Sequence, residues 1–118
     1  MKNEVMASPT FSGNTLCWYE GDTVAVDFKI TFTDENGYTR GLIATDEVKI
    51  VFKDMAKREV ISYAFSGITD EKITLWIDET DSALFKKGMY SLIMAVSYDE
   101  GERRQRTTIE DNMRVVVN

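Results

Sequence analysis

The chain has 118 residues, of which 43% are hydrophobic, and its formal net charge at pH 7 is -6. This length suits one domain with its own core, and no run of apolar residues reaches the length of a membrane-spanning helix. The acidic balance disfavours binding to a nucleic-acid duplex, and the absence of histidine excludes hydrolases built on Ser-His-Asp or Cys-His sets.

We interpret residues 1–13 as an N-terminal arm and residues 14–118 as one domain. The arm has no continuous apolar stretch, so we expect no signal peptide. Cys17 is the one cysteine, which excludes an internal disulfide and indicates a reducing compartment. We expect Cys17 to be a small buried hydrophobe, because the acidic residues that follow it supply no cation to activate a thiolate.

The clearest element is a long alternating strand at residues 23–33. It is bounded by a glycine turn before it and by Asp-Glu-Asn-Gly after it, and Asn-Gly is a strong turn signal. Its apolar residues occupy every second position: Val24, Val26, Phe28, Ile30 and Phe32. We therefore expect these side chains to face the core and the residues between them to face water.

Alternation of the same kind continues to the end of the chain. It predicts strands at 15–19, 46–54, 60–65, 72–78, 89–98, 103–109 and 113–117. Residues 38–45 show no such pattern, and residues 80–88 predict a single helical turn at most. The sequence thus predicts an all-β fold, an antiparallel sandwich of seven to eight strands in two facing sheets.

Two stretches carry motifs in an order that is found in a known family. Residues 21–42 hold Gly-Asp-Thr, the long alternating strand, an Asp-x-Asn-Gly turn and a leucine. Residues 70–118 hold a strand, a turn with Asp, Thr and Leu, Gly-x-Tyr, a long strand, a glycine turn and a valine-rich last strand. This order resembles the immunoglobulin-like modules of tailed-phage virion proteins, in particular the N-terminal domain of the baseplate upper protein family.

The resemblance implies an immunoglobulin-like sandwich and a non-enzymatic structural role in a virion. The expected place is the baseplate, a fibre anchor, the neck or a capsid accessory (decoration) protein. The expected partners are other virion proteins in a symmetric assembly, further copies of the chain among them, and no membrane. An alternative stays open: a surface-exposed module that binds a ligand or carbohydrate through loops at one end.

Two residues near the expected helical turn have structural interpretations. Leu84 is expected to plug the open end of the sandwich. Tyr90 either reaches back to a backbone group, as in a tyrosine corner, or packs in the core with a satisfied hydroxyl.

Apolar residues on the outward faces of strands are the candidate interface. Trp76, Ile93, Ala95 and Val116 lie opposite the inward sets of their strands. A monomer rarely exposes a contiguous patch of this kind, and Trp is enriched in interface hot spots. The alternative is that the arm or a loop covers some of them.

The one basic cluster is Arg-Arg-Gln-Arg at 103–106, where Arg104 and Arg106 share a face and join the candidate interface. Protection of an edge strand by charge is the default interpretation. Salt bridges to a neighbouring subunit and contact with nucleic acid are the alternatives.

The acidic stretches 78–82 and 110–112 would hold calcium only if they met at one end of the sandwich, and otherwise they cap their own turns. Paired carboxylates for glycoside cleavage would need a separation that the sequence does not give. We expect no catalytic residue, no cofactor and no metal.

Overall fold

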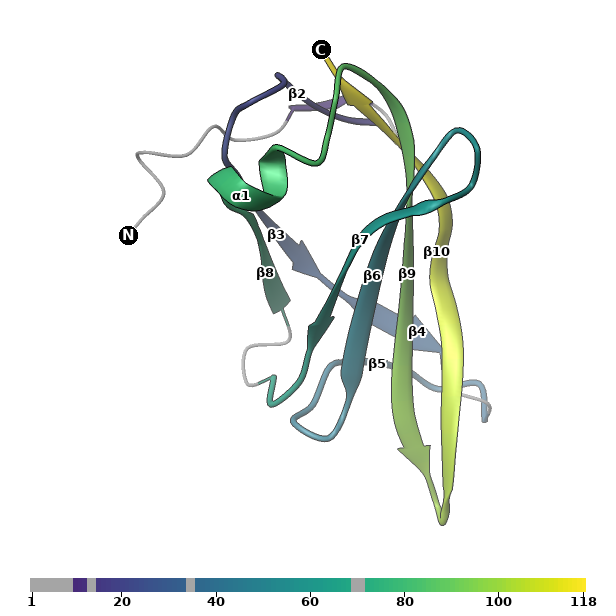
Figure 1. Cartoon of the computed structure of the whole chain (residues 1–118). Coiled ribbons are helices and arrows are strands. Elements are labelled where there is room, and N and C mark those ends of the chain that lie inside the picture. The colour runs from purple at the N-terminus through teal and green to yellow at the C-terminus, as the bar shows by residue number, and fades with distance from the viewer. Residues whose placement is uncertain (1–9, 13–14, 34–35, 69–71) are drawn as a thin grey trace.

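The fold was obtained as a computed structural model, which describes residues 10–12, 15–33, 36–68 and 72–118 (Figure 1). Within these ranges there are ten strands and one short helix. They are β1 (Thr10–Ser12), β2 (Thr15–Trp18), β3 (Val24–Lys29), β4 (Thr31–Thr33), β5 (Thr39–Gly41), β6 (Glu47–Asp54), β7 (Glu59–Phe65), β8 (Lys72–Ile77), α1 (Glu79–Ser82), β9 (Gly88–Glu100) and β10 (Arg103–Val117).

The strands form one large sheet and two small ones. The large sheet has the order β1-β2-β10-β9-β6-β7, and β3 pairs with β8 and β4 with β5. Figure 1 shows the β3–β8 pair packed across one side of the large sheet, with β4 and β5 farther along the same side. Buried apolar residues from all three sheets form one core. The all-β prediction is confirmed.

The structure differs from the predicted sandwich in four respects. The described residues hold ten strands rather than seven or eight, and β2 pairs with β10 in parallel, so the pairing is not all antiparallel. The long strand at 23–33 is divided at Ile30, because β3 pairs with β8 while β4 turns to pair with β5. The expected arm also contributes β1, which pairs with β2.

The two predicted strands at the end of the chain are one strand. β10 pairs with β9 along its whole length, with register shifts between Thr108 and Glu110 and between Glu110 and Met113. Such bulges add residues on one side of a ladder, so a strand can change which residues face the core without ending. The β9–β10 hairpin therefore runs the length of the molecule, and its turn reaches beyond the other elements in Figure 1.

Aromatic rings close the core near α1. The ring of Phe85, which is 1% exposed, lies 5.1 to 5.3 Å from the rings of Trp18, Phe52 and Tyr90. Leu84, by contrast, is 51% exposed. The prediction that Leu84 fills the open end of the sandwich is therefore wrong, and the next residue, Phe85, fills it. α1 ends at Ser82, and the chain that follows it directs the side chain of Phe85 rather than that of Leu84 into the sandwich.

The hydroxyl of Tyr90 confirms the first of its two interpretations. It donates to the carbonyl oxygen of Lys86 at 2.7 Å and accepts from the Lys86 amide at 2.8 Å. These two bonds tie the chain before β9 to the core, as a tyrosine corner does.

An ion pair closes the other end of the core, where β4, β5 and β9 meet. The guanidinium of Arg40 holds both oxygens of Asp46, at 2.8 and 3.0 Å, and the Asp46 side chain is fully buried. The guanidinium also lies over the rings of Phe32 and Tyr98, at 4.5 and 5.8 Å from their centroids. Asp46 further accepts from the Ile43 amide, so the pair fixes the loop that the sequence left unassigned.

Candidate docking surfaces

The outer face of the β3–β8 pair carries the most exposed tryptophan of the described residues. The alternation of β8 puts Ile73, Leu75 and Ile77 in the core, so Trp76 faces outward and is 51% exposed. Its cross-strand partner, Ala25, is 6% exposed although it lies on the same outer face. The sequence therefore predicted the orientation of Trp76 correctly.

Polar residues fix the surface beside Trp76. On the neighbouring strand Asp27 accepts a hydrogen bond of 2.6 Å from the Thr74 hydroxyl, and Lys72 Nζ lies 3.8 Å from its other oxygen. At the other side of the indole, Asp78 follows β8 and accepts from the Asp81 amide at 2.8 Å, and the exposed Glu79 comes next. Trp76 thus stands between carboxylates held in place by local bonds.

The other candidate residues lie on the outer face of the large sheet. Ile93 and Val116 are half-buried, and Ala95 is 4% exposed, because its small side chain lies between Lys49 on β6 and Thr108 on β10. The structure places these three residues on the same face, with Val116 opposite Met89, which lies four positions along β9 from Ile93, and it places Trp76 on the outer face of the β3–β8 pair. The candidate interface is therefore two surfaces.

Among the residues whose side chains the structure describes, the outer face of the large sheet carries more basic than acidic groups. The outward-facing residues Ser91, Ile93, Ala95 and Ser97 of β9 run along its middle. The charged residues with described side chains that flank them on β6 and β10 are Glu47, Lys49, Lys53, Arg106 and Arg114. Arg104, farther along β10, donates to Asp99 at 2.9 Å and to the Thr45 carbonyl at 3.0 Å. Arg106 lies opposite Ser97 and is exposed. This face contrasts with the net negative charge of the chain.

A hollow of about 410 Å³ opens where the β6–β7 turn meets the β9–β10 ladder. Its lining comprises Asp54, Met55, Lys57, Met89, Tyr90, Ser91 and Arg114. Met55 is 71% exposed and Met89 40% exposed, and Met89 pairs across the ladder with Val116. The sequence pattern does not indicate either methionine as part of a site, and its only signal is a methionine inside a polar turn.

The acid in this lining belongs to the turn. Asp54 accepts from the amides of Ala56 and Arg58, and its second oxygen lies 3.2 Å from the Arg58 guanidinium. The Arg58 amide bond, above all, lowers the pKa of Asp54. Asp54 therefore holds the β6–β7 turn in place, and Lys57 and Arg114 remain as the other charged groups of the lining.

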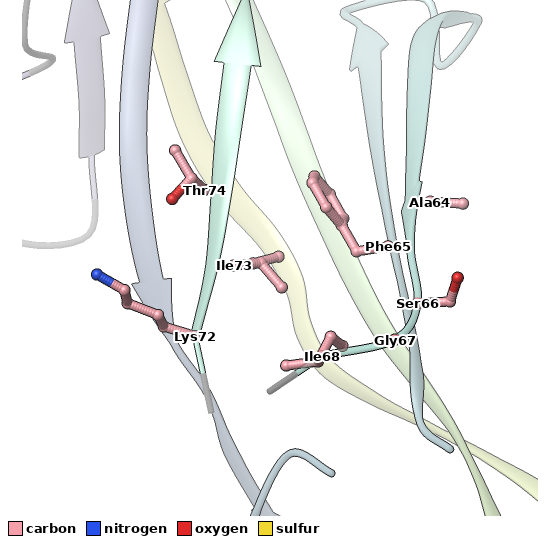
Figure 2. A pocket seen from close by; sticks show the side chains of 8 residues that line it. All are labelled: Ala64, Phe65, Ser66, Gly67, Ile68, Lys72, Ile73 and Thr74. Atoms are coloured by element: carbon pink, nitrogen blue, oxygen red, sulfur yellow. The ribbon is translucent and has the colours of Figure 1, made fainter. Parts of the chain in front are cut away.

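A second hollow, of about 480 Å³, lies where β7 ends and β8 begins (Figure 2). Figure 2 shows Phe65, Ile68 and Ile73 toward its interior, while Lys72 and Thr74 point to the far side of β8. Among the described residues of the lining, Lys72 is the one ionisable side chain, and it is paired with Asp27. The residues that the structure describes here offer no pair of groups for nucleophilic or acid–base chemistry.

The acidic residues near α1 serve the local structure. Asp78 caps α1, and the Tyr63 hydroxyl donates to Asp81 at 3.0 Å. Burial, and after it this bond to Asp81, raises the pKa of Tyr63. Among the residues whose placement is described, no group of three acids or cysteines is arranged to hold a metal ion. The side chains at 110–112, which the calcium alternative needs, lie outside the described residues.

Comparison of the chain with models of protein families, with curated proteins and with solved structures found no match. In the part of the chain that the structure describes, no helix is long and apolar enough to cross a membrane.

Proposed function

We propose that this chain is a non-enzymatic structural component of a tailed-phage virion that acts through protein–protein docking. The sandwich is of the immunoglobulin-like kind, and the place of action is the baseplate, a fibre anchor, the neck or the capsid surface. The order of motifs along the sequence supports the virion context.

The observation that carries the docking role is the position of Trp76. A large ring that is 51% exposed on a regular two-stranded surface does nothing for the core, which Ile73, Leu75 and Ile77 already fill from the same strand. Trp is among the residues that contribute most to binding at protein interfaces. Local hydrogen bonds hold the acids on both sides of the ring, so the surface is ordered before a partner arrives.

The hollows of the surface fit docking better than catalysis. Among the described residues of the two linings, no nucleophile is bonded to a base, and the carboxylates with known partners support turns or cross-strand pairs. Catalysis by side chains needs an acid, base or nucleophile that is free to act.

A carbohydrate-binding module is the second candidate, and exposed tyrosines in turns favour it. Tyr19 is 68% exposed after β2, and Tyr38 is 72% exposed between β4 and β5. These turns lie at opposite ends of the molecule in Figure 1, so the two rings do not converge on one ligand. Binding of soluble oligosaccharides that Tyr19→Ala or Tyr38→Ala abolishes would favour this candidate over the first.

The experiment for the first candidate measures incorporation into phage particles. Trp76→Ala is compared with Leu84→Ala, whose side chain is also 51% exposed and lies outside the β3–β8 face. We expect both variants to fold like the wild type, and only Trp76→Ala to weaken co-sedimentation with particles, by at least about tenfold. Equal incorporation of the two variants would remove Trp76 from the docking surface.

A further inference from the structure

We propose that the partner of Trp76 is a second copy of this chain, and that its indole enters the hollow at the β6–β7 turn of that copy. This inference rests on the proposed docking function and names the surface that Trp76 meets. The contact joins two different surfaces of the chain, so each copy offers one Trp76 and one hollow.

The size and lining of the hollow suit an indole ring. A cavity of roughly 150 Å³ holds a benzene ring, so the hollow, at about 410 Å³, has room for a tryptophan side chain. Met55 and Met89 give it two exposed, adaptable side chains, and thioether sulfur packs well against aromatic rings. Arg114 supplies a guanidinium that can stack on the face of the indole.

Charges of opposite sign lie beside the two surfaces, apart from Lys72, which pairs with Asp27 near Trp76, and Asp54, which pairs with Arg58 at the hollow. Asp78 and Glu79 follow Trp76 at the end of β8, and Asp27 lies diagonally across from it on β3. The hollow has Lys57 and Arg114 in its lining, and Lys53 on β6 stands across Ser91 from Arg114. Charges that complement each other across an interface steer association and select the partner. A second copy supplies this complement without any further protein.

The candidate residues of the large sheet fall beside this contact. Val116 pairs with Met89, and Ile93 and Ala95 continue the outer face of β9 beyond Ser91. A copy that places its β3–β8 face over the hollow would cover this strip as well. The four apolar positions then belong to one interface, in which one copy contributes Trp76 and the other copy contributes the remaining three.

The two surfaces lie on different sides of the sandwich. Figure 1 shows β8 on one side of the molecule and the β6–β7 turn on the other. A contact between unlike surfaces repeats from copy to copy, so it builds a ring if the rotation closes and a filament if it does not. A ring of more than two copies needs a contact of this kind.

The test uses two variants of the full chain and their mixture. Trp76→Ala removes the ring, and Met55→Glu with Met89→Glu places acids in the hollow. Ile43→Glu is the control for the second variant, because Ile43 is also exposed, at 51%, and lies outside both surfaces. Thermal melts first check that all variants fold as the wild type does.

Sedimentation velocity then gives the mass of each sample at concentrations up to about 1 mM. We expect the wild type and Ile43→Glu to associate, and added salt to weaken the association. Each interface variant alone associates at least about tenfold more weakly. An equimolar mixture of the two variants forms a dimer and nothing larger, because each variant keeps one intact surface.

Three results would overturn the inference: a monomeric wild type over this range, self-association that survives in the hollow variant, or a mixture that stays monomeric. If the wild type is monomeric and Trp76→Ala still loses incorporation into particles, the proposed function stands and the partner is another protein. If incorporation is also unchanged, both proposals fail.

Discussion

The two ends of the core are closed by different chemistry. Near α1 the closing group is an aromatic cluster around Phe85, whose ring meets three other rings at 5.1 to 5.3 Å. Near β4 and β5 it is the guanidinium of Arg40, held by the buried Asp46 and stacked on Phe32 and Tyr98. One end depends on burial of apolar area and the other on a pair of charges.

This difference explains why the core is not purely apolar from one end of the sandwich to the other. At the α1 end the chain returns through a helical turn, which brings Phe85 inward. At the other end the loop after β5 has polar backbone groups to satisfy, and Asp46 accepts from the Ile43 amide while Arg40 donates to the Gly41 carbonyl. Buried polar groups need such partners, so a charged pair closes this end.

The largest expected effect is at the aromatic end. Phe85→Ala should lower the free energy of unfolding by about 3–5 kcal/mol, because it removes a buried ring and leaves a cavity. Leu84→Ala, at the neighbouring exposed residue, should stay within about 0.5 kcal/mol of the wild type. Urea unfolding of the two variants gives both values. If Leu84→Ala lowered the free energy of unfolding more than Phe85→Ala did, Leu84 rather than Phe85 would be the residue that closes this end of the core.

At the polar end, Arg40→Ala should cost about 3 kcal/mol, because it leaves the buried Asp46 carboxylate without its counter-charge. Arg58→Ala is the matched control, since Arg58 also pairs with an aspartate but its side chain is 79% exposed. An exposed pair contributes little, so this control should cost less than about 1 kcal/mol. Denaturant unfolding measures the loss in free energy of unfolding for both variants. Equal losses for Arg40→Ala and Arg58→Ala would contradict the view that a buried ion pair closes this end of the core.

A smaller effect with a pH signature is expected for Tyr63, which donates to Asp81 beside α1. Its pKa is raised, mainly by burial, so the fold favours the neutral phenol. This contribution is complete below the pKa of an unfolded tyrosine, about 10, and is lost as the pH rises above that value.

Tyr63→Phe should therefore lower the free energy of unfolding by about 1 kcal/mol at neutral pH. The difference in free energy of unfolding between wild type and variant should become smaller above a pH of about 10. Urea unfolding of both proteins across this range measures this difference, and a difference that grows with pH would contradict the assignment.

The sequence predicted those parts of the fold that depend on alternation within one strand. The phase of Ile73, Leu75 and Ile77 places Trp76 outward, and the structure has it there. The division of residues 23–33 was not predictable in this way, because Ile30 continues the alternation and only the pairing partners of β3 and β4 differ. Phe28, beside the division, is half-buried and packs against the core.

Features made by distant segments were also missed. Arg40 and Asp46 lie in a stretch without periodicity, and nothing in the pattern indicates that they clasp each other across a loop. Met55 and Met89 come from a turn and from the start of β9, and they form one hollow only because β6 and β9 are neighbours. The sequence thus indicated the docking surface around Trp76 but not the hollow.

The central claim is that Trp76 serves docking rather than folding. Its most direct test pairs a thermal melt with co-sedimentation of Trp76→Ala against phage particles. We expect the variant to have a free energy of unfolding within about 0.5 kcal/mol of the wild type and an incorporation weakened at least about tenfold. A large loss of stability would place Trp76 in the core, and normal incorporation would contradict the docking role.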